Sequence, residues 1–291
     1  MICGLGCAAV LLSSACLATN TATNAVTDTT TNSSRDFVAD NIFTQGIEGP
    51  VFYKQHLYAV NFAEQGTIGK VDSSGKAQLF IKLPNDSVGN GLQFDSQGNL
   101  YIADYVNHNI LKVPANSLSV EVFAHNKTMN QPNDIAITKR GALFASDPNW
   151  ANSTGKLWRI NADGSTQLLE DNMGTTNGVA VNNDNSKLYV NESVQRVIWQ
   201  YDLDSDLNIS NKQPLIKFAD HGMDGMRVDN QGNLFVARYG AGVILKISPA
   251  GKVLHTYMLT GQHPTNVAFN EQQTKLFVTM QKRGAIEVIE L

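Results

Sequence analysis

Six residues whose side chains end in a carboxylate or a carboxamide recur along the chain at nearly equal intervals. They are Glu48, Asn90, Asn133, Asn177, Asp224 and Asn266, and the intervals between them are 42, 43, 44, 47 and 42 residues. Such side chains offer oxygen atoms, which are the ligands that hard divalent cations such as Ca²⁺ prefer. Turn preference explains an Asn or Asp before a strand, but Glu is no turn former, so it does not explain all six. The pattern predicts an oxygen-lined cation site if the fold gathers these residues.

Each of these residues opens a repeated frame of short strands. In 90–104 and in 224–238, a strand-sized run is followed by a turn with the letters Gln-Gly-Asn-Leu and then by a second run. Each frame holds about four runs rich in Val, Ile, Tyr, Phe and Thr, and helical periodicity is absent. A period of 40 to 45 residues with short strands is typical of propeller blades. We therefore predict an all-β fold, a six-bladed β-propeller.

The sixth frame ends at Leu291 after only three strands. Segment 36–43, which precedes the first frame, is the obvious donor of the missing strand. Pairing it with 285–291 would close the ring and remove an exposed sheet edge.

Propeller geometry predicts where the six recurring residues lie. The first strand of each blade lines the central channel, and these strands run in one direction, so the residues that precede them face the same mouth. The repeated part of the chain has no Cys, and its six His are scattered, which argues against a closed zinc site. Calcium is the expected ion, while Zn²⁺ or Mg²⁺ remain alternatives in the cell.

The first residues differ from the rest of the chain. Residues 1–18 are small and apolar, as in a signal peptide, and 19–35 form a tether rich in Thr, Asn and Ser, for which we expect disorder. The propeller is predicted over 36–291. All three cysteines lie in the first segment, and Cys16 follows a loose lipoprotein cleavage pattern. We expect export to the periplasm or beyond, with lipidation of Cys16 or plain cleavage as the two alternatives.

Composition limits the partners. The formal net charge is −4, so the basic surface that nucleic-acid binding requires is missing. The apolar run of the leader is too short to span a bilayer, and no transmembrane helix is predicted. We expect a monomer that acts on a small molecule.

The chain also resembles the gluconolactonase and senescence marker protein-30 (regucalcin) family, LRE-like proteins included, with the bacterial gluconolactonase branch nearest. The resemblance rests on short segments in the expected order, which are Glu48-Gly-Pro-Val-Phe, Gln131-Pro-Asn-Asp134, Phe144-Ala-Ser-Asp-Pro148, Thr176-Asn-Gly-Val179, Asp224-Gly-Met226 and Pro264-Thr-Asn-Val-Ala-Phe269. One departure touches the sugar pocket, because regucalcin-like members carry an Arg where this chain has Gln131.

The resemblance implies a metal, usually calcium, held by Glu48, Asn133, Asn177 and Asp224. It further implies that Asn133 contacts substrate and that Asp224 is the general base. Asp134 and Asp147 are candidates for orienting substrate or supporting a ligand, although both could equally cap turns.

The function implied is a calcium-dependent hydrolase of a small ester, with a sugar lactone as the favoured substrate. Three alternatives stay open. The same site could hydrolyse non-sugar lactones or phosphotriesters, the propeller could bind a ligand without turnover, or the repeats could be structural with no metal.

Overall fold

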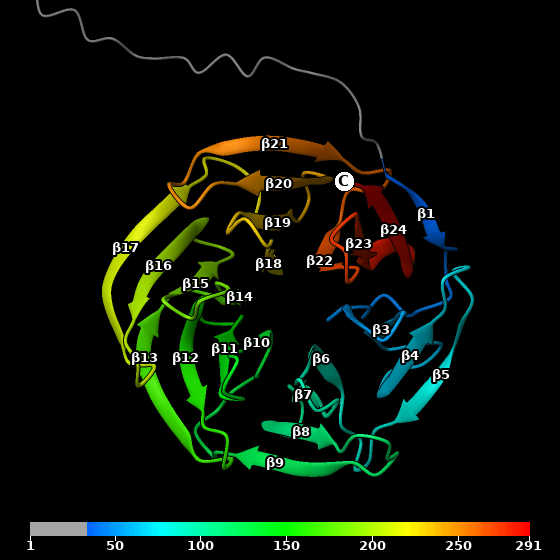
Figure 1. The fold of residues 1–291 in the computed structure, drawn as a ribbon, viewed down its shortest axis with the longest axis horizontal. Coiled ribbons are helices and arrows are strands. Elements are labelled where there is room, and N and C mark those ends of the chain that lie inside the picture. The colour runs from blue at the N-terminus through cyan, green and yellow to red at the C-terminus, as the bar shows by residue number, and fades with distance from the viewer. Residues whose placement is uncertain (1–33) are drawn as a thin grey trace, which may run out of the picture. The chain divides into compact units, whose positions relative to one another are not determined.

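The computed structural model describes residues 34–291, which form six four-stranded antiparallel sheets arranged around an axis (Figure 1). The first three sheets are β2 (Val51–Tyr53), β3 (His56–Val60), β4 (Thr67–Val71) and β5 (Ala77–Lys82); β6 (Gly89–Phe94), β7 (Leu100–Asp104), β8 (Asn109–Val113) and β9 (Glu121–His125); and β10 (Ile135–Ile137), β11 (Leu143–Asn149), β12 (Thr154–Ile160) and β13 (Thr166–Met173). The other three are β14 (Thr176–Val181), β15 (Lys187–Glu192), β16 (Val197–Leu203) and β17 (Ile209–Lys217); β18 (Met226–Val228), β19 (Leu234–Arg238), β20 (Val243–Ile247) and β21 (Val253–Met258); and β22 (Pro264–Phe269), β23 (Lys275–Met280), β24 (Ala285–Glu290) and β1 (Arg35–Val38). A 3-10 turn, η1 (Gln281–Arg283), joins β23 to β24. The predicted six-bladed propeller is confirmed.

The sixth sheet closes the ring with a strand from the start of the described chain, as predicted. Strand β1 pairs antiparallel with β24, with Arg35 opposite Val288 and Asp36 opposite Glu287. The strand is shorter than the predicted 36–43, because Asn41 adopts a positive φ of 63° that no regular strand contains. The closing contact joins residues about 250 positions apart.

The apolar core lies between neighbouring sheets. One aromatic residue on the second strand of each blade is almost fully buried there: Tyr58, Tyr101, Phe144, Tyr189, Phe235 and Phe277. The first interface, for example, packs Val60 and Ile68 of one blade against Leu92 and Ile102 of the next. Burying each such aliphatic side chain stabilises the fold by about 1.5–3 kcal/mol. The recurring aromatic residues therefore serve packing between blades.

The predicted leader, with Cys16, and nearly all of the predicted tether lie outside the described residues. Within 34–291, no helix has the length and the apolar character that a bilayer crossing demands.

Candidate functional site

The first strand of every blade lies next to the axis, where Figure 1 labels β6, β10, β14, β18 and β22 around the centre. These strands contact their neighbours around the ring, and β2 completes it between β22 and β6. The predicted site residues stand at or just before the starts of these strands. Glu48 precedes β2, Asn133 precedes β10, Asn177 is the second residue of β14, and Asp224 precedes β18. The topology therefore places all four at one end of the channel.

Glycines that directly follow the recurring acidic and amide residues, such as Gly49 after Glu48 and Gly225 after Asp224, let the inner strands approach closely. A Cβ at Gly225 would lie 1.9 Å from the amide carbon of Asn266. Gly49 has a φ of +54°, and a Cβ there would lie 2.0 Å from the backbone oxygen of Asn90. Neither space admits a side chain. The repeated acid-Gly or amide-Gly dipeptide is thus explained by backbone packing at the axis.

The carboxyl groups of Glu48 and Asp224 lie close enough to shift each other's pKa. Glu48 is 8% exposed, and its Oε2 accepts hydrogen bonds from Gly49 N at 2.5 Å and from Asn266 Nδ2 at 3.2 Å. Burial, helped by the charge of Asp134, raises the pKa of Glu48 to about 7. Burial and the neighbouring Glu48 also raise the pKa of Asp224 well above its usual range. Two carboxyl groups this close cannot both ionise easily without a cation, so the pair retains a proton near neutral pH.

Two carboxamides add oxygens that have no partner. The side chain of Asn177 lies close enough to Asp224 to oppose the rise in the pKa of that carboxyl group. The Oδ1 atoms of Asn177 and Asn133 are both buried and accept no hydrogen bond within 34–291. A buried amide oxygen without a partner is costly, and a cation would satisfy it.

The donor set therefore fits a hard cation. It combines two carboxylates that resist joint ionisation with two orphaned amide oxygens. Among the described residues, no group of three or more His, Cys, Asp or Glu side chains could hold a metal ion. Any cation at this end of the channel would thus depend on the carboxamides as well as on the acids.

Asp134 has a different environment. It is 1% exposed, and its Oδ2 accepts a bond at 3.1 Å from Nη1 of Arg227, which lies on β18. Val179 N donates to the same oxygen at 3.3 Å, and Ile135 N donates to Oδ1 at 3.0 Å. These bonds engage both carboxylate oxygens with protein groups, and Arg227 ties the third blade to the fifth.

Asp147 also makes its hydrogen bonds to the protein. It accepts from the backbone of Asn130 and Gln131 at 2.8 and 2.6 Å, and from Trp158 Nε1 at 2.9 Å. Of the two roles that the sequence left open, these bonds match the capping one. The carboxylate fixes the loop that leads to Asn133.

Sequence reasoning missed Arg227 and Asn191. Asn191 is fully buried at the end of β15; its Nδ2 donates to the backbone oxygen of Asp224 at 2.6 Å, and its Oδ1 has no partner within 34–291. A charged residue inside the innermost strand was the available signal for Arg227. The available signal for Asn191 was a carboxamide at a strand position where the other blades carry Val, Ala, Ser or Thr.

Known proteins resemble the chain over most of its length. The sequence model of the family described as SMP-30/Gluconolactonase/LRE-like region matches residues 47–282. Gluconolactonase of Zymomonas mobilis is 30% identical over 217 residues, which cover 65% of this chain but only 60% of that enzyme. 6-Deoxy-6-sulfogluconolactonase of Pseudomonas putida is 26% identical, with 75% of this chain and 77% of the enzyme covered. Diisopropyl-fluorophosphatase of Loligo vulgaris is 26% identical, with coverage of 83% and 87%.

Solved structures agree on the architecture. A calcium-binding regucalcin from Agrobacterium tumefaciens superposes with a TM-score of 0.77 at 19% identity, covering 88% of this chain and 94% of that one. A gluconolactonase from Xanthomonas campestris gives a TM-score of 0.76 at 19% identity, with coverage of 89% and 90%. At these identities the likeness establishes the fold. Together with the family match, the axial geometry shows that the chain belongs to the SMP-30/gluconolactonase/LRE-like family.

Proposed function

We propose that this protein is a calcium-dependent hydrolase of small esters and that its substrate is a sugar lactone. One observation carries the proposal: the paired carboxyls of Glu48 and Asp224 lie at the same end of the channel as Asn133 and Asn177, whose buried Oδ1 atoms have no hydrogen-bond partner within 34–291. The gluconolactonases among the relatives point to the lactone. The regucalcins among the relatives and structural neighbours point to calcium.

The four residues would hold the ion through oxygen atoms alone. When bound, a divalent cation supplies electrostatic polarisation of an ester carbonyl and compensates negative charge that develops on it. It also favours the ionised forms of Glu48 and Asp224, whose pKa values are raised by burial and by each other. Asp224 would then be free to accept a proton from the attacking water.

Asn133 and Asp134 have separate parts in this proposal. The side chain of Asn133 would donate its Nδ2–H to the substrate while its Oδ1 serves the cation. Asp134 has both oxygens engaged by Arg227 and by backbone N–H groups. We therefore propose that Asp134 acts indirectly: it holds Arg227 and the backbone next to Asn133 in place and does not contact substrate.

Phosphotriester hydrolysis is a second candidate. The match to diisopropyl-fluorophosphatase covers 87% of that enzyme, more than the match to the Zymomonas gluconolactonase does. The same oxygen-lined site could polarise a phosphoryl oxygen as well as a carbonyl oxygen.

A substrate panel tests both candidates. Purified protein would be assayed with aldonolactones, aryl esters and a phosphotriester, each with EDTA and with added Ca²⁺. We expect lactone hydrolysis that depends on Ca²⁺. Faster phosphotriester turnover would select the second candidate, and equal rates with EDTA and with Ca²⁺ would remove the cation from the mechanism.

A further inference from the structure

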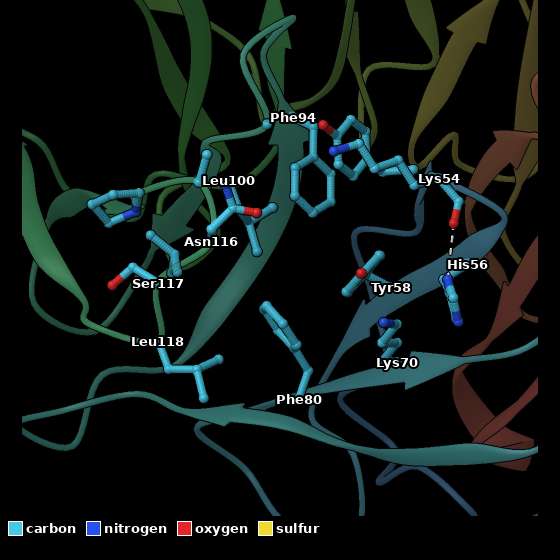
Figure 2. A pocket seen from close by; sticks show the side chains of 15 residues that line it. Lys54, His56, Tyr58, Lys70, Phe80, Phe94, Leu100, Asn116, Ser117 and Leu118 are labelled. Atoms are coloured by element: carbon cyan, nitrogen blue, oxygen red, sulfur yellow. Dashed lines mark hydrogen bonds between the residues drawn. The ribbon is translucent and has the colours of Figure 1, made fainter.

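A cavity of about 390 Å³ lies between the first and second blades. Four aromatic rings form much of its wall: Tyr53 and Phe94 stack with their centroids 4.3 Å apart, and Tyr58 meets Phe80 and Phe94 edge to face. Figure 2 shows Phe94, Tyr58 and Phe80 around an open centre, with Leu118 on the opposite side. Tyr53 ends β2, whereas Glu48 precedes its start, so the cavity is about 15 Å along the strand from the carboxyl pair.

The cavity is basic without internal compensation. Lys54, His56 and Lys70 line it, and its lining contains no Asp or Glu. The Nζ atoms of Lys54 and Lys70 lie 5.1 and 5.8 Å from the ring centres of Tyr53 and Tyr58. No carboxylate within 34–291 forms an ion pair with either lysine. Four further cavities between or beside the blades each include at least one Asp or Glu.

A comparison with the fifth blade shows why Lys70 of the first-blade cavity has no carboxylate partner. There Lys246 lies opposite Phe235 and forms an ion pair with Asp229 at 3.2 Å. In the first blade Lys70 lies opposite Tyr58 in the same register. The residue that flanks the turn in the place of Asp229 is Tyr53, however, so the carboxylate partner is lost.

The turn itself is also shorter in the first blade. Two residues, Lys54 and Gln55, join β2 to β3, and both have positive φ values, of 46° and 66°. In the fifth blade three residues separate Asp229 from Asn233, and the aspartate caps them through bonds of 2.8 and 2.9 Å. The fifth blade has at this place an aspartate that neutralises the nearby Lys246. The shorter turn of the first blade presents instead the ammonium group of Lys54 and the ring of Tyr53.

We propose that this cavity is a binding site for a small aromatic carboxylate of one or two rings. The aromatic wall matches a flat apolar body through stacking and edge contacts. Lys54 and Lys70, which have no ion-pair partner within 34–291, each offer an ammonium group to the carboxylate of such a ligand. The volume suits a molecule of this size. The site is separate from the carboxyl pair and needs no turnover there.

Calorimetric titration of the whole chain with 2-naphthoate tests the proposal. We expect one site with a Kd of about 0.1–1 mM, as the modest affinity per atom of such ligands dictates. The neutral analogue 2-naphthalenemethanol has nearly the same shape and should bind at least about fivefold more weakly, because it lacks the charge. Raising the salt concentration should weaken naphthoate and leave the alcohol unchanged.

Two surface variants locate the binding. Lys70→Gln should weaken naphthoate by about three- to tenfold. Its matched control is Lys112→Gln, which removes the equivalent lysine of the second blade from a cavity that contains Asp95, and it should bind like the wild type. Leu118 is 65% exposed at the cavity edge, so Leu118→Glu should fold normally and repel the ligand, while Leu118→Gln should not.

Three results would overturn the proposal. They are no measurable binding at 1 mM naphthoate, equal binding of the alcohol, and undiminished binding by both Lys70→Gln and Leu118→Glu. The last result would place naphthoate elsewhere, such as at the channel mouth. None of these results bears on lactone hydrolysis, so this proposal and the proposed function fail separately.

Discussion

The carboxyl groups near the axis fall into two sets with different surroundings, Asp134 alone and Glu48 with Asp224. Asp134 has Arg227 at 3.1 Å and two backbone N–H donors. Glu48 and Asp224 have each other, amide donors and no basic side chain among the causes that set their pKa values. One set is neutralised within the chain, and the other is left requiring either a proton or a cation. The comparison supports the proposal that the unneutralised pair is the reactive one.

The strongest test changes the unneutralised pair. Asp224→Asn keeps the shape of the side chain but removes the proton acceptor, so lactone turnover should fall by about 10³-fold or more. Initial rates measured in a pH-stat with saturating Ca²⁺ would show this, with far-UV circular dichroism to confirm the fold. Near-normal turnover would exclude Asp224 as the base.

The next test removes the cationic partner of Asp134. Arg227→Gln leaves Asp134 buried without its cationic partner, which should lower the free energy of unfolding by about 3–4 kcal/mol. Urea unfolding measures the loss. The double variant Arg227→Gln/Asp134→Asn should recover much of it, because no charge is then left unpaired. A double variant no more stable than the single one would mean that Arg227 stabilises the fold by packing alone.

The pH dependence of stability sharpens the contrast. The pKa of Glu48 is raised from 4.5 to about 7, so the folded state binds a proton that the unfolded state has already released. Stability from this group is complete below about pH 4.5 and is lost as pH rises through about 7, by at most about 3 kcal/mol. Urea unfolding in EDTA at pH 5 and pH 8 should show the loss. Glu48→Gln serves as the control and should flatten the difference.

The smallest effect is the response to the ion itself. Calcium at about one hundred times its Kd should stabilise the folded chain by about 2.7 kcal/mol, which corresponds to roughly 5 °C in Tm for a domain of this size. Differential scanning calorimetry with EDTA and with Ca²⁺ measures the shift. Asp224→Asn should respond less, and an identical Tm in both buffers would count against any cation at the pair.

Sequence reasoning predicted the features that repeat and missed those that do not. The 42- to 47-residue spacing of Glu48 and its counterparts predicted the six sheets, and the missing strand of the sixth frame predicted the ring closure. The role of Arg227 was not predicted, because its contact with Asp134 crosses the channel between blades that are not adjacent. The repeat period identifies equivalent positions in the blades, but it does not predict which side chains meet across the channel.

The first-blade cavity escaped for the opposite reason. It arises where the repeat fails, at Tyr53 and the shortened turn beside it, and a comparison of frames treats such a position as degenerate. The identity of the ion, the role of each ligand and the leader with Cys16 remain predictions.

The joint between β1 and β24 has a consequence for the order of assembly. Residues 35–38 have their strand partner in 285–290, so they stay unpaired until the two ends of the described chain meet. Until β1 pairs with β24, the ring is not closed, and the first and sixth blades, which carry Glu48 and Asn266, are not held together. A cation that depended on residues from both the first and the last blade would therefore bind only after this closure, so its uptake would report that the ring is complete.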